Sequence, residues 1–384
     1  MRICYISYAK YGAGDWVHTF QFTTALQKIH DDIVIHTPLI HLGRSGSSEQ
    51  HPVKKNKDLV NNFRELRLLF AMFLRHLPEE FRLLKTTKPD VVILRQERYV
   101  SAILLCHLLG IPILIESNAP FLEHQFSPID RLIGRKFWCW LEKNMMRWAD
   151  HIIVVSKELK QYYVSCGLLQ EQITAVPNGV DIHTVHPGIK DERIREKFGL
   201  QGKIVIGFSG NFAPWHGLDF LADAIKKLTA YHKKNAIALL LIGRPGTRVI
   251  MPDLPDDFTI ITGRVPYKEI PQYLAAVDIF VAPYPHITPF YFSPLKIFEA
   301  MAMGKAVVAS AQGQICELIV HGTSGLLYPP GDTEAFLKNI ELLIHDVALR
   351  NELGRNARKT IETKYTWLEN ANRILSLCKQ VANR

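Results

Sequence analysis

The segment from Ser293 to Gly304 carries two ionisable residues in an otherwise apolar stretch, Lys296 and Glu299. A helix places both on one face, because they lie three residues apart. A lysine in the first helical turn is unfavourable beside the positive end of the helix dipole unless an anion binds there too. Free backbone N–H groups, the dipole and Lys296 therefore predict a phosphate site. Glu299 is placed to accept hydrogen bonds from a sugar such as ribose. The alternative is a Lys296–Glu299 salt bridge at the edge of a core helix.

The residues around this pair favour a buried helix with defined ends. Ser293 is a good N-cap, and Pro294 suits the first helical position. Gly304 suits the residue just past the end. Nearly every residue between them is apolar, which is typical of a helix that is buried all round.

Other polar or glycine-rich clusters follow apolar runs that are typical of strands. Ligands of parallel sheets bind beyond the carboxyl ends of the strands, so these clusters are candidate site residues. Each one alone can also be explained as a turn or a solvated loop. The clusters are Gly12–Gly14, Glu116–Asn118, Ser209–Asn211 with Trp215–Gly217, Gly243–Arg244 and Gly263–Val265.

The elements that must position these residues alternate between strands and helices. Strands are expected at 2–7, 33–36, 91–94, 113–116, 152–155 and 173–176, and again at 203–208, 239–242, 259–262, 279–283, 306–309 and 325–328. Apolar strands separated by helices imply α/β domains with parallel sheets covered on both faces. We expect two doubly wound, Rossmann-like domains, 1–183 and 184–365, joined by a hinge at 183–190. A last helix within 366–384 is placed to pack back on the first domain.

Composition narrows the class of protein and the compartment. The 384 residues are 47% hydrophobic and 22% charged, with a net charge of +9, which suits two soluble domains and anionic partners. The six cysteines have no metal-ligand spacing and indicate a reducing compartment. We expect no metal site. No uncharged apolar run reaches the ~18 residues of a spanning helix. These features predict a cytoplasmic protein, and the chain lacks a basic-aromatic motif for nucleic acid.

One long amphipathic segment has two explanations. Leu59, Phe63, Leu66, Phe70, Phe73 and Leu77 form one helical stripe that Pro78 is expected to stop, while Arg64, Arg67 and Arg75 gather on another face. Residues 53–89 contain nine basic and four acidic residues, a net charge of +5. This is either a core helix with a solvated arginine face or a surface that rests on anionic lipid.

With these residues laid out, the chain resembles the retaining GT-B glycosyltransferases of family four, group 1. The resemblance implies two domains that face a central cleft and transfer a sugar with retention of configuration, without a bound metal or other cofactor. The nucleotide-sugar donor would lie mainly on the second domain and a saccharide or lipid-linked acceptor on the first. The segments that carry the resemblance are Ala13–His18, Ala149–Ser156, Pro177–Asp181, Gly207–Gly217, Thr262–Val265, Ala276–Pro283, Ser293–Ser310 and Gly322–Asp332.

The resemblance also implies roles for individual residues. Glu299 would hold the ribose, and backbone N–H groups around Ser293, Leu295 and Lys296 would hold the diphosphate. Gly14 would let the diphosphate approach the first domain. Further donor contacts are expected at Gly210, Asn211, Arg264, Val265 and Tyr291.

The chain departs from the family pattern at several of these positions. Tyr291 stands where the family has a carboxylate, and Asn211 and His216 stand where it has a phosphate-binding arginine and lysine. Asn118 stands where a histidine is frequent. We take Glu116, Asn118 and His216 as candidate catalytic residues, with His216 and Lys296 stabilising the leaving diphosphate. His216 as a helix cap is the alternative, and His18 is interpreted as a structural helix residue.

Three functions remain open at this stage. The segments Ser293–Lys296, Phe298–Ala300 and Trp215–Gly217 resemble a bacterial subgroup that makes surface polysaccharides or glycoconjugates. A nucleotide-sugar 2-epimerase shares the architecture but should show more carboxylates at strand ends than Glu116 and Glu299. A binding subunit without activity is the third, because a fold does not determine a function.

Overall fold

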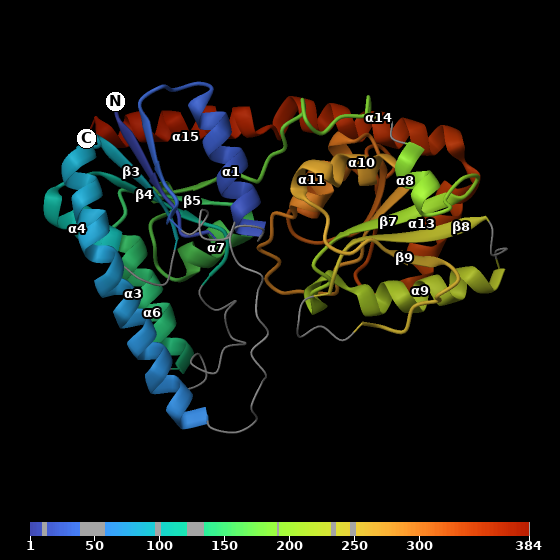
Figure 1. Cartoon of the computed structure of the whole chain (residues 1–384), viewed down its shortest axis with the longest axis horizontal. Helices are drawn as coiled ribbons and strands as arrows, with labels where there is room; N and C mark the ends of the chain where they lie inside the picture. The colour runs from blue at the N-terminus through green and yellow to red at the C-terminus, as the bar shows by residue number, and fades with distance from the viewer. Residues whose placement is uncertain are drawn as a thin grey trace. The chain divides into compact units, whose positions relative to one another are not determined.

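The structure is a computed structural model that describes residues 1–9, 14–38, 58–96, 101–120, 134–189, 192–231, 236–245 and 251–383. The chain forms two compact units, Met1–Pro177 with Leu368–Arg384, and Asn178–Trp367 (Figure 1). Residues 178–183, which were placed in the first domain from the sequence, belong to the second unit. The backbone N–H of Val180 bonds to the carbonyl of Tyr365 (3.1 Å) and ties this segment there.

The first unit is built on a six-stranded parallel sheet in the order β2-β1-β3-β4-β5-β6. The strands predicted for this half are confirmed to within two residues at each end. They are β1 (Ile3–Ile6), β2 (Ile33–His36), β3 (Val91–Arg95), β4 (Ile113–Ser117), β5 (His151–Val154) and β6 (Ile173–Ala175). The helices are α1 (Gly14–Gln27), α3 (Asp58–Thr87), α4 (Ser101–Leu109), α6 (Gly134–Arg147), α7 (Lys157–Ser165), the 3₁₀ turn η2 (Gln170–Gln172) and α15 (Trp367–Ala382).

The second unit repeats this plan with the strand order β12-β11-β10-β7-β8-β9, again parallel. Its strands, also predicted, are β7 (Ile204–Gly210), β8 (Ile237–Gly243), β9 (Thr259–Ile261), β10 (Ile279–Ala282), β11 (Ala306–Ser310) and β12 (Leu326–Tyr328). The helices are α8 (Glu192–Lys197), η3 (Pro214–His216), α9 (Leu218–Tyr231), η4 (Tyr267–Glu269), α10 (Ile270–Ala275), α11 (Leu295–Ala302), α12 (Ile315–Leu318), α13 (Thr333–His345) and α14 (Val347–Lys364).

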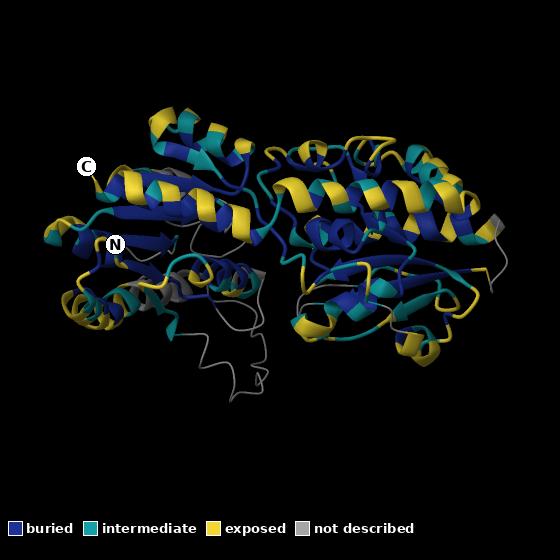
Figure 2. Ribbon diagram, turned by 90° about the horizontal axis from the view of Figure 1, so that it is seen from above, coloured by how far each residue is buried: buried dark blue, intermediate teal, exposed yellow. Residues whose placement is uncertain are grey.

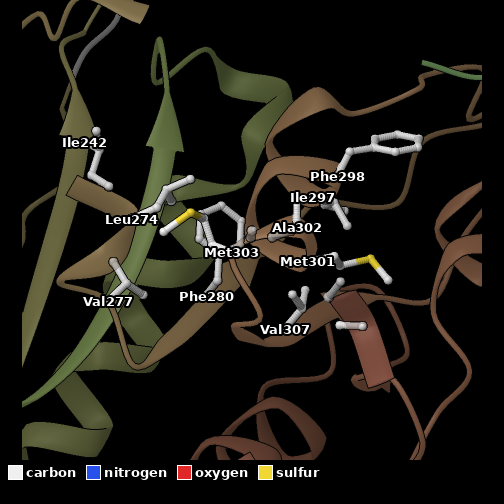
Figure 3. Packing of buried hydrophobic residues seen from close by; sticks show 14 of the residues in the cluster. Ile242, Leu274, Val277, Phe280, Ile297, Phe298, Met301, Ala302, Met303 and Val307 are labelled. Carbon is white, nitrogen blue, oxygen red and sulfur yellow. The ribbon is translucent and has the colours of Figure 1, made fainter. Parts of the chain in front are cut away.

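Both faces of the second sheet are covered, as parallel sheets require. Val205, Leu240 and Phe280 pack with residues of α11 and α14 in one buried cluster. Their strand neighbours, such as Ile206 and Val281, pack with α9 and α13 in another. Figure 3 shows the first cluster, with Phe280 close to α11. Figure 2 shows the same layering as buried strands beneath helices that are exposed on one side only. The carboxyl ends of the strands are thus held by two independent cores.

Helix α11 starts later than predicted. Pro294 has an extended backbone (φ −77°, ψ 96°) and the helix begins at Leu295, so the assignment of Ser293 as N-cap is wrong. The Ser293 hydroxyl instead accepts a hydrogen bond from the backbone N–H of Asn178 (2.9 Å), a partner far away in sequence. The predicted end is confirmed. Gly304 has φ 67°, and the N–H of Lys305 bonds to the carbonyl of Ala300 (3.0 Å), as in a Schellman motif.

Helix α3 corrects two expectations about the amphipathic segment. It continues through Pro78 to Thr87, so the proline does not stop it. Pro78 lies on the exposed side, where water can satisfy the carbonyl that has lost its N–H partner. Phe70, expected on the buried stripe, is exposed, whereas His76 and Glu80 are buried. The side chains of Leu59, Phe63, Leu66, Arg64 and Arg67, and all of residues 39–57, lie outside the described residues.

None of the helices in the described part of the chain is long and apolar enough to cross a membrane.

Arg358 of α14 fixes the far end of α11. One guanidinium nitrogen donates to the carbonyls of Ala302 (2.8 Å) and Val185 (2.7 Å), and the other donates to that of Ile182 (3.1 Å). A cation at a helix carboxyl end also interacts favourably with the helix dipole.

We expect Arg358→Met to lower the free energy of unfolding by about 2–4 kcal/mol, because three partly buried carbonyls lose their charged donor. Arg355→Met, one turn earlier on the exposed side, is the matched control and should change stability by less than ~0.5 kcal/mol. Denaturant unfolding monitored by circular dichroism measures both. If both variants lower the free energy of unfolding by the same small amount, water replaces the guanidinium at the three carbonyls.

Candidate functional site

The candidate site of the second unit is assembled at the carboxyl ends of its parallel strands. Gly210 ends β7, His216 follows in η3, and Tyr267 lies in η4 after β9. Lys296 and Glu299 occupy the first turns of α11, which follows β10. Because the strands all run in one direction, these segments end at the same edge of the sheet. The sequence therefore places several functional groups within reach of one another.

The ammonium group of Lys296 is buried without a hydrogen-bond partner among the described residues. Its Nζ lies 4.2 Å from the ring centroid of Phe208 and 5.6 Å from that of Tyr284. Burial lowers the pKa of Lys296 well below its usual value, and the nearby Glu299 only partly opposes this shift. The hydrogen-bonded Lys296–Glu299 ion pair that was the alternative explanation does not form. Aromatic faces stabilise a cation weakly, so the ammonium remains poorly satisfied.

Gly210 allows Lys296 to lie against the end of β7. Its φ of +153° is rarely adopted by residues with a side chain. A Cβ at this position would lie 2.8 Å from the Lys296 Nζ and 3.4 Å from Cε1 of His216. Glycine thus suits both the backbone conformation and the close approach of the Lys296 ammonium, which a Cβ would displace. The sequence prediction at residues 209–211 falls on this contact.

His216 joins Lys296 on the same side of β7. Its ring centroid lies 5.8 Å from that of Phe208 and 5.8 Å from that of Tyr284, and its buried Nδ1 bonds to no described residue. Burial, followed by the charge of Lys296, lowers the pKa of His216 to about 2. The imidazole is therefore neutral at pH 7. A neutral ring keeps one N–H that can donate to an anion.

Glu299 is buried one turn beyond Lys296. The Tyr267 hydroxyl donates a hydrogen bond to its carboxylate. Burial raises the pKa of Glu299 to about 7, although the Tyr267 hydrogen bond and the Lys296 charge act to lower it. Sequence reasoning missed Tyr267, although it lies only two residues beyond Val265 in a loop that the strand-end rule had selected. The carboxylate is thus oriented by a tyrosine and is close to its protonation midpoint.

The remaining predicted donor residues surround this centre in different ways. Asn211 is exposed, and its side-chain oxygen accepts from the Ala213 N–H (3.4 Å). Tyr291 is half-buried, with its ring 4.7 Å from that of Phe292. Ser293 is buried and bonded to Asn178 through its hydroxyl and its carbonyl. Of the others, Arg264 is exposed, and Val265 and Leu295 are half-buried.

Glu116 belongs to the first unit, where it is the centre of a buried polar network. Its carboxylate lies 2.5 Å from Nε2 of His18, accepts from the Tyr5 hydroxyl (2.9 Å) and lies 3.6 Å from Nη1 of Arg95. Burial acts to raise the pKa of Glu116, but His18 and Arg95 outweigh it and hold the pKa at about 2. His18 is buried within α1. This network suits a fixed negative charge better than proton transfer.

The other predicted residues of the first unit lie near this network in sequence. Asn118 is half-buried and directly follows β4, and Gly14 is the first residue of α1. Residues 10–13, including Gly12 of the predicted glycine turn, lie outside the described residues. Within the described ranges no group of three or more His, Cys, Asp and Glu side chains could hold a metal ion.

Two family models match the chain, Glycosyltransferase Family 4 over residues 14–184 and Glycosyl transferases group 1 over residues 203–346. The chain belongs to the family-4, group 1 glycosyltransferases. Among solved structures with the same fold, Anabaena Alr3699/HepE in complex with UDP has a TM-score of 0.72 at 18% identity, covering 99% of this chain and 100% of that one. Sucrose-phosphate synthase (tll1590) from Thermosynechococcus elongatus has a TM-score of 0.73 at 18% identity, covering 99% and 98%. The GT-B fold expected for the family is thereby confirmed.

Two curated transferases match the chain at low identity. A GDP-mannose-dependent alpha-mannosyltransferase from Mycobacterium tuberculosis is 27% identical over 59% of this chain and 57% of its own length. Sulfoquinovosyl transferase SQD2 from Arabidopsis thaliana is 27% identical over 73% of this chain and 54% of its own. The chain thus spans little more than half the length of these relatives.

The raised pKa of Glu299 predicts that this residue lowers the free energy of unfolding as the pH rises. Between its ordinary value near 4.5 and its folded value of about 7, the folded state binds the proton more tightly than the unfolded chain does. Stability is therefore lost as the pH rises through this window. Glu299→Gln should be more stable than the wild type by up to about 3 kcal/mol at pH 8, and by less than about 1 kcal/mol at pH 5.

Denaturant unfolding at the two pH values measures this difference. Glu352→Gln, which changes an exposed glutamate of α14, is the control and should show no pH-dependent gain. If both variants follow the wild-type pH dependence, Glu299 does not carry a buried charge above pH 7.

Proposed function

We propose that this chain is a retaining, metal-independent glycosyltransferase that moves a sugar from a nucleotide-sugar donor to a saccharide or lipid-linked acceptor in the synthesis of surface polysaccharides or other glycoconjugates. The second unit binds the donor, and the acceptor binds on the first. Family membership supports the reaction class. The site in the second unit supports the donor class.

The observation that carries this proposal is the unpartnered ammonium of Lys296 at the start of α11. A buried cation without a partner is costly, and the positive end of the helix dipole increases that cost. The first N–H groups of a helix also lack partners within it. An anion with several oxygens, such as a diphosphate, satisfies the ammonium and these N–H groups together.

The neighbours of Lys296 fit the remainder of such a donor. Glu299 accepts hydrogen bonds from the ribose hydroxyls, and Tyr267 orients it for this purpose. His216, neutral and with a free ring nitrogen, donates to a phosphate oxygen. When the bond between sugar and diphosphate breaks, negative charge grows on the diphosphate, where Lys296, His216 and the helix start are concentrated. Similar folds in complex with UDP and with UDP-glucose support a nucleotide-sugar as the donor class.

Thermal-shift measurements with UDP-, GDP- and ADP-sugars test the proposal first, because a ligand that binds only the folded state raises the unfolding temperature. Product analysis with the stabilising donor follows, with and without saccharide acceptors. Transfer with retained anomeric configuration in the presence of a chelator supports the proposal in full. Epimerised donor without acceptor would identify the chain as an epimerase. Donor binding without any turnover would identify a binding subunit.

Lys296→Met should separate phosphate recognition from nucleoside recognition. We expect it to weaken binding of the nucleoside diphosphate by about 10–100-fold, because a charge-assisted contact is lost, with nucleoside affinity unchanged. Glu299→Gln should instead weaken nucleoside and nucleoside diphosphate by the same factor. Isothermal titration calorimetry measures all four affinities. Equal losses for both ligands in Lys296→Met would point to a structural role for the lysine.

A further inference from the structure

Helix α3 of the first unit presents apolar side chains to solvent over its described side chains, residues 70–87. Phe70, Leu74 and Phe81 are 62%, 49% and 44% exposed. The side that packs inward carries His76, Glu80 and Leu84, of which two are ionisable. A surface helix normally buries its apolar stripe and exposes its polar one. In α3 this order is reversed at three positions.

The exposed apolar residues form one narrow stripe. At about 100° per residue, Phe70, Leu74 and Phe81 lie within about 40° of one another around the helix. The inward side lies about 100° from the stripe in one direction. On the other side of the stripe, within about 100° of its edge, lie Lys85, Arg82 and Arg75. The stripe and the basic row together are here called the α3 face.

The basic row is free to meet an external anion. Arg75, Arg82 and Lys85 are exposed and form no ion pair with any residue that the structure describes. The Lys85 ammonium instead lies 5.7 Å from the ring centroid of Phe81. Of the two acidic residues of this segment, Glu80 is buried, and the carboxylate of Glu79, four residues from Arg75, lies 3.7 Å from Nε2 of His36 and 4.0 Å from Nδ1 of His76.

Exposed aromatic side chains are concentrated in the same unit. Within the described residues, five of the six exposed phenylalanines and tryptophans belong to it. Only Trp215 lies in the second unit. The five are Phe20, Phe70, Phe81, Trp140 and Trp148. Of these, Phe70 and Phe81 lie on the α3 stripe, and an exposed apolar stripe beside charges marks an interaction surface rather than an ordinary solvent-facing helix.

We propose that the α3 face docks this protein on the surface of a membrane that contains anionic phospholipids. Phenylalanine and leucine side chains in a row enter the boundary between headgroups and acyl chains, while flanking lysine and arginine side chains reach lipid phosphates. The side chains of a phenylalanine–leucine row offer no polar edge that reads a nucleic-acid base, whereas a lipid interface needs only apolar area and positive charge. The inference goes beyond sugar transfer and is independent of it.

Co-sedimentation with vesicles tests this surface without any donor or acceptor. Two vesicle types are compared, phosphatidylcholine alone and equal parts of phosphatidylcholine and phosphatidylglycerol. The wild type should sediment with the anionic vesicles at low salt and not with the neutral ones. Arg75/Arg82/Lys85→Glu should weaken this partitioning by at least about 10-fold. Phe70/Leu74/Phe81→Ser should weaken it as well, in low and in moderate salt.

Two matched controls come from the second unit. Arg355/Lys359/Lys364→Glu makes the same change of charge on exposed residues of α14, and Val320/Leu342/Val347→Ser removes as many exposed apolar side chains. Both should bind vesicles as the wild type does. Circular dichroism and the thermal shift with nucleotide check that every variant is folded.

The proposal is overturned if the wild type does not bind anionic vesicles at low salt. It is also overturned if the two control variants of the second unit weaken binding as much as the α3 variants, since net charge or general hydrophobicity would then explain the result. Binding to heparin that equals binding to vesicles, with no loss in the serine variant, would indicate an unspecific polyanion effect. Nucleotide affinities are unaffected by any of these outcomes.

Discussion

The candidate site of the second unit is arranged around one unsatisfied group, the buried ammonium of Lys296 at the positive end of α11. Several neighbouring features fit this single group. Gly210 lacks the side chain that would collide with it, and Arg358 holds the opposite end of the helix. Two apolar cores keep the strand ends beneath it in place. A fold with this much support can retain a local arrangement that is unfavourable until an anion binds.

The two buried glutamates show how the surroundings of a carboxylate set its pKa. Glu116 is bonded to His18 and Tyr5 and faces Arg95, and its pKa is held at about 2. Glu299 has Tyr267 and an incompletely satisfied lysine, and its pKa is raised to about 7. The first carboxylate is already stable as an ion. The second gains from a ligand that brings hydroxyl donors, which agrees with a role in binding ribose.

The sequence was sufficient for the fold because its strands are apolar, short and bounded by turns, and this pattern depends only on neighbouring residues. The position of Gly304 was predictable for the same reason. Ser293 was not, since its hydroxyl bonds to Asn178 rather than to its own helix. Tyr267 and the partners of Glu116 were likewise missed, because they meet through contacts between residues that are far apart in the chain. Site residues that belong to one local motif are therefore predictable, and those that orient them are not.

The same distinction explains α3. Its periodic pattern fixes which residues share a stripe, but only the fold determines which stripe faces inward. The buried side carries His76 and Glu80, with Glu80 bonded to the Tyr8 hydroxyl (2.5 Å), so polar partners at the strand ends anchor the helix there. Phe70, Leu74 and Phe81 then remain outside. Leu84 packs inward beside His76 and Glu80, so the apolar stripe and its basic border remain available for a partner other than the protein's own core.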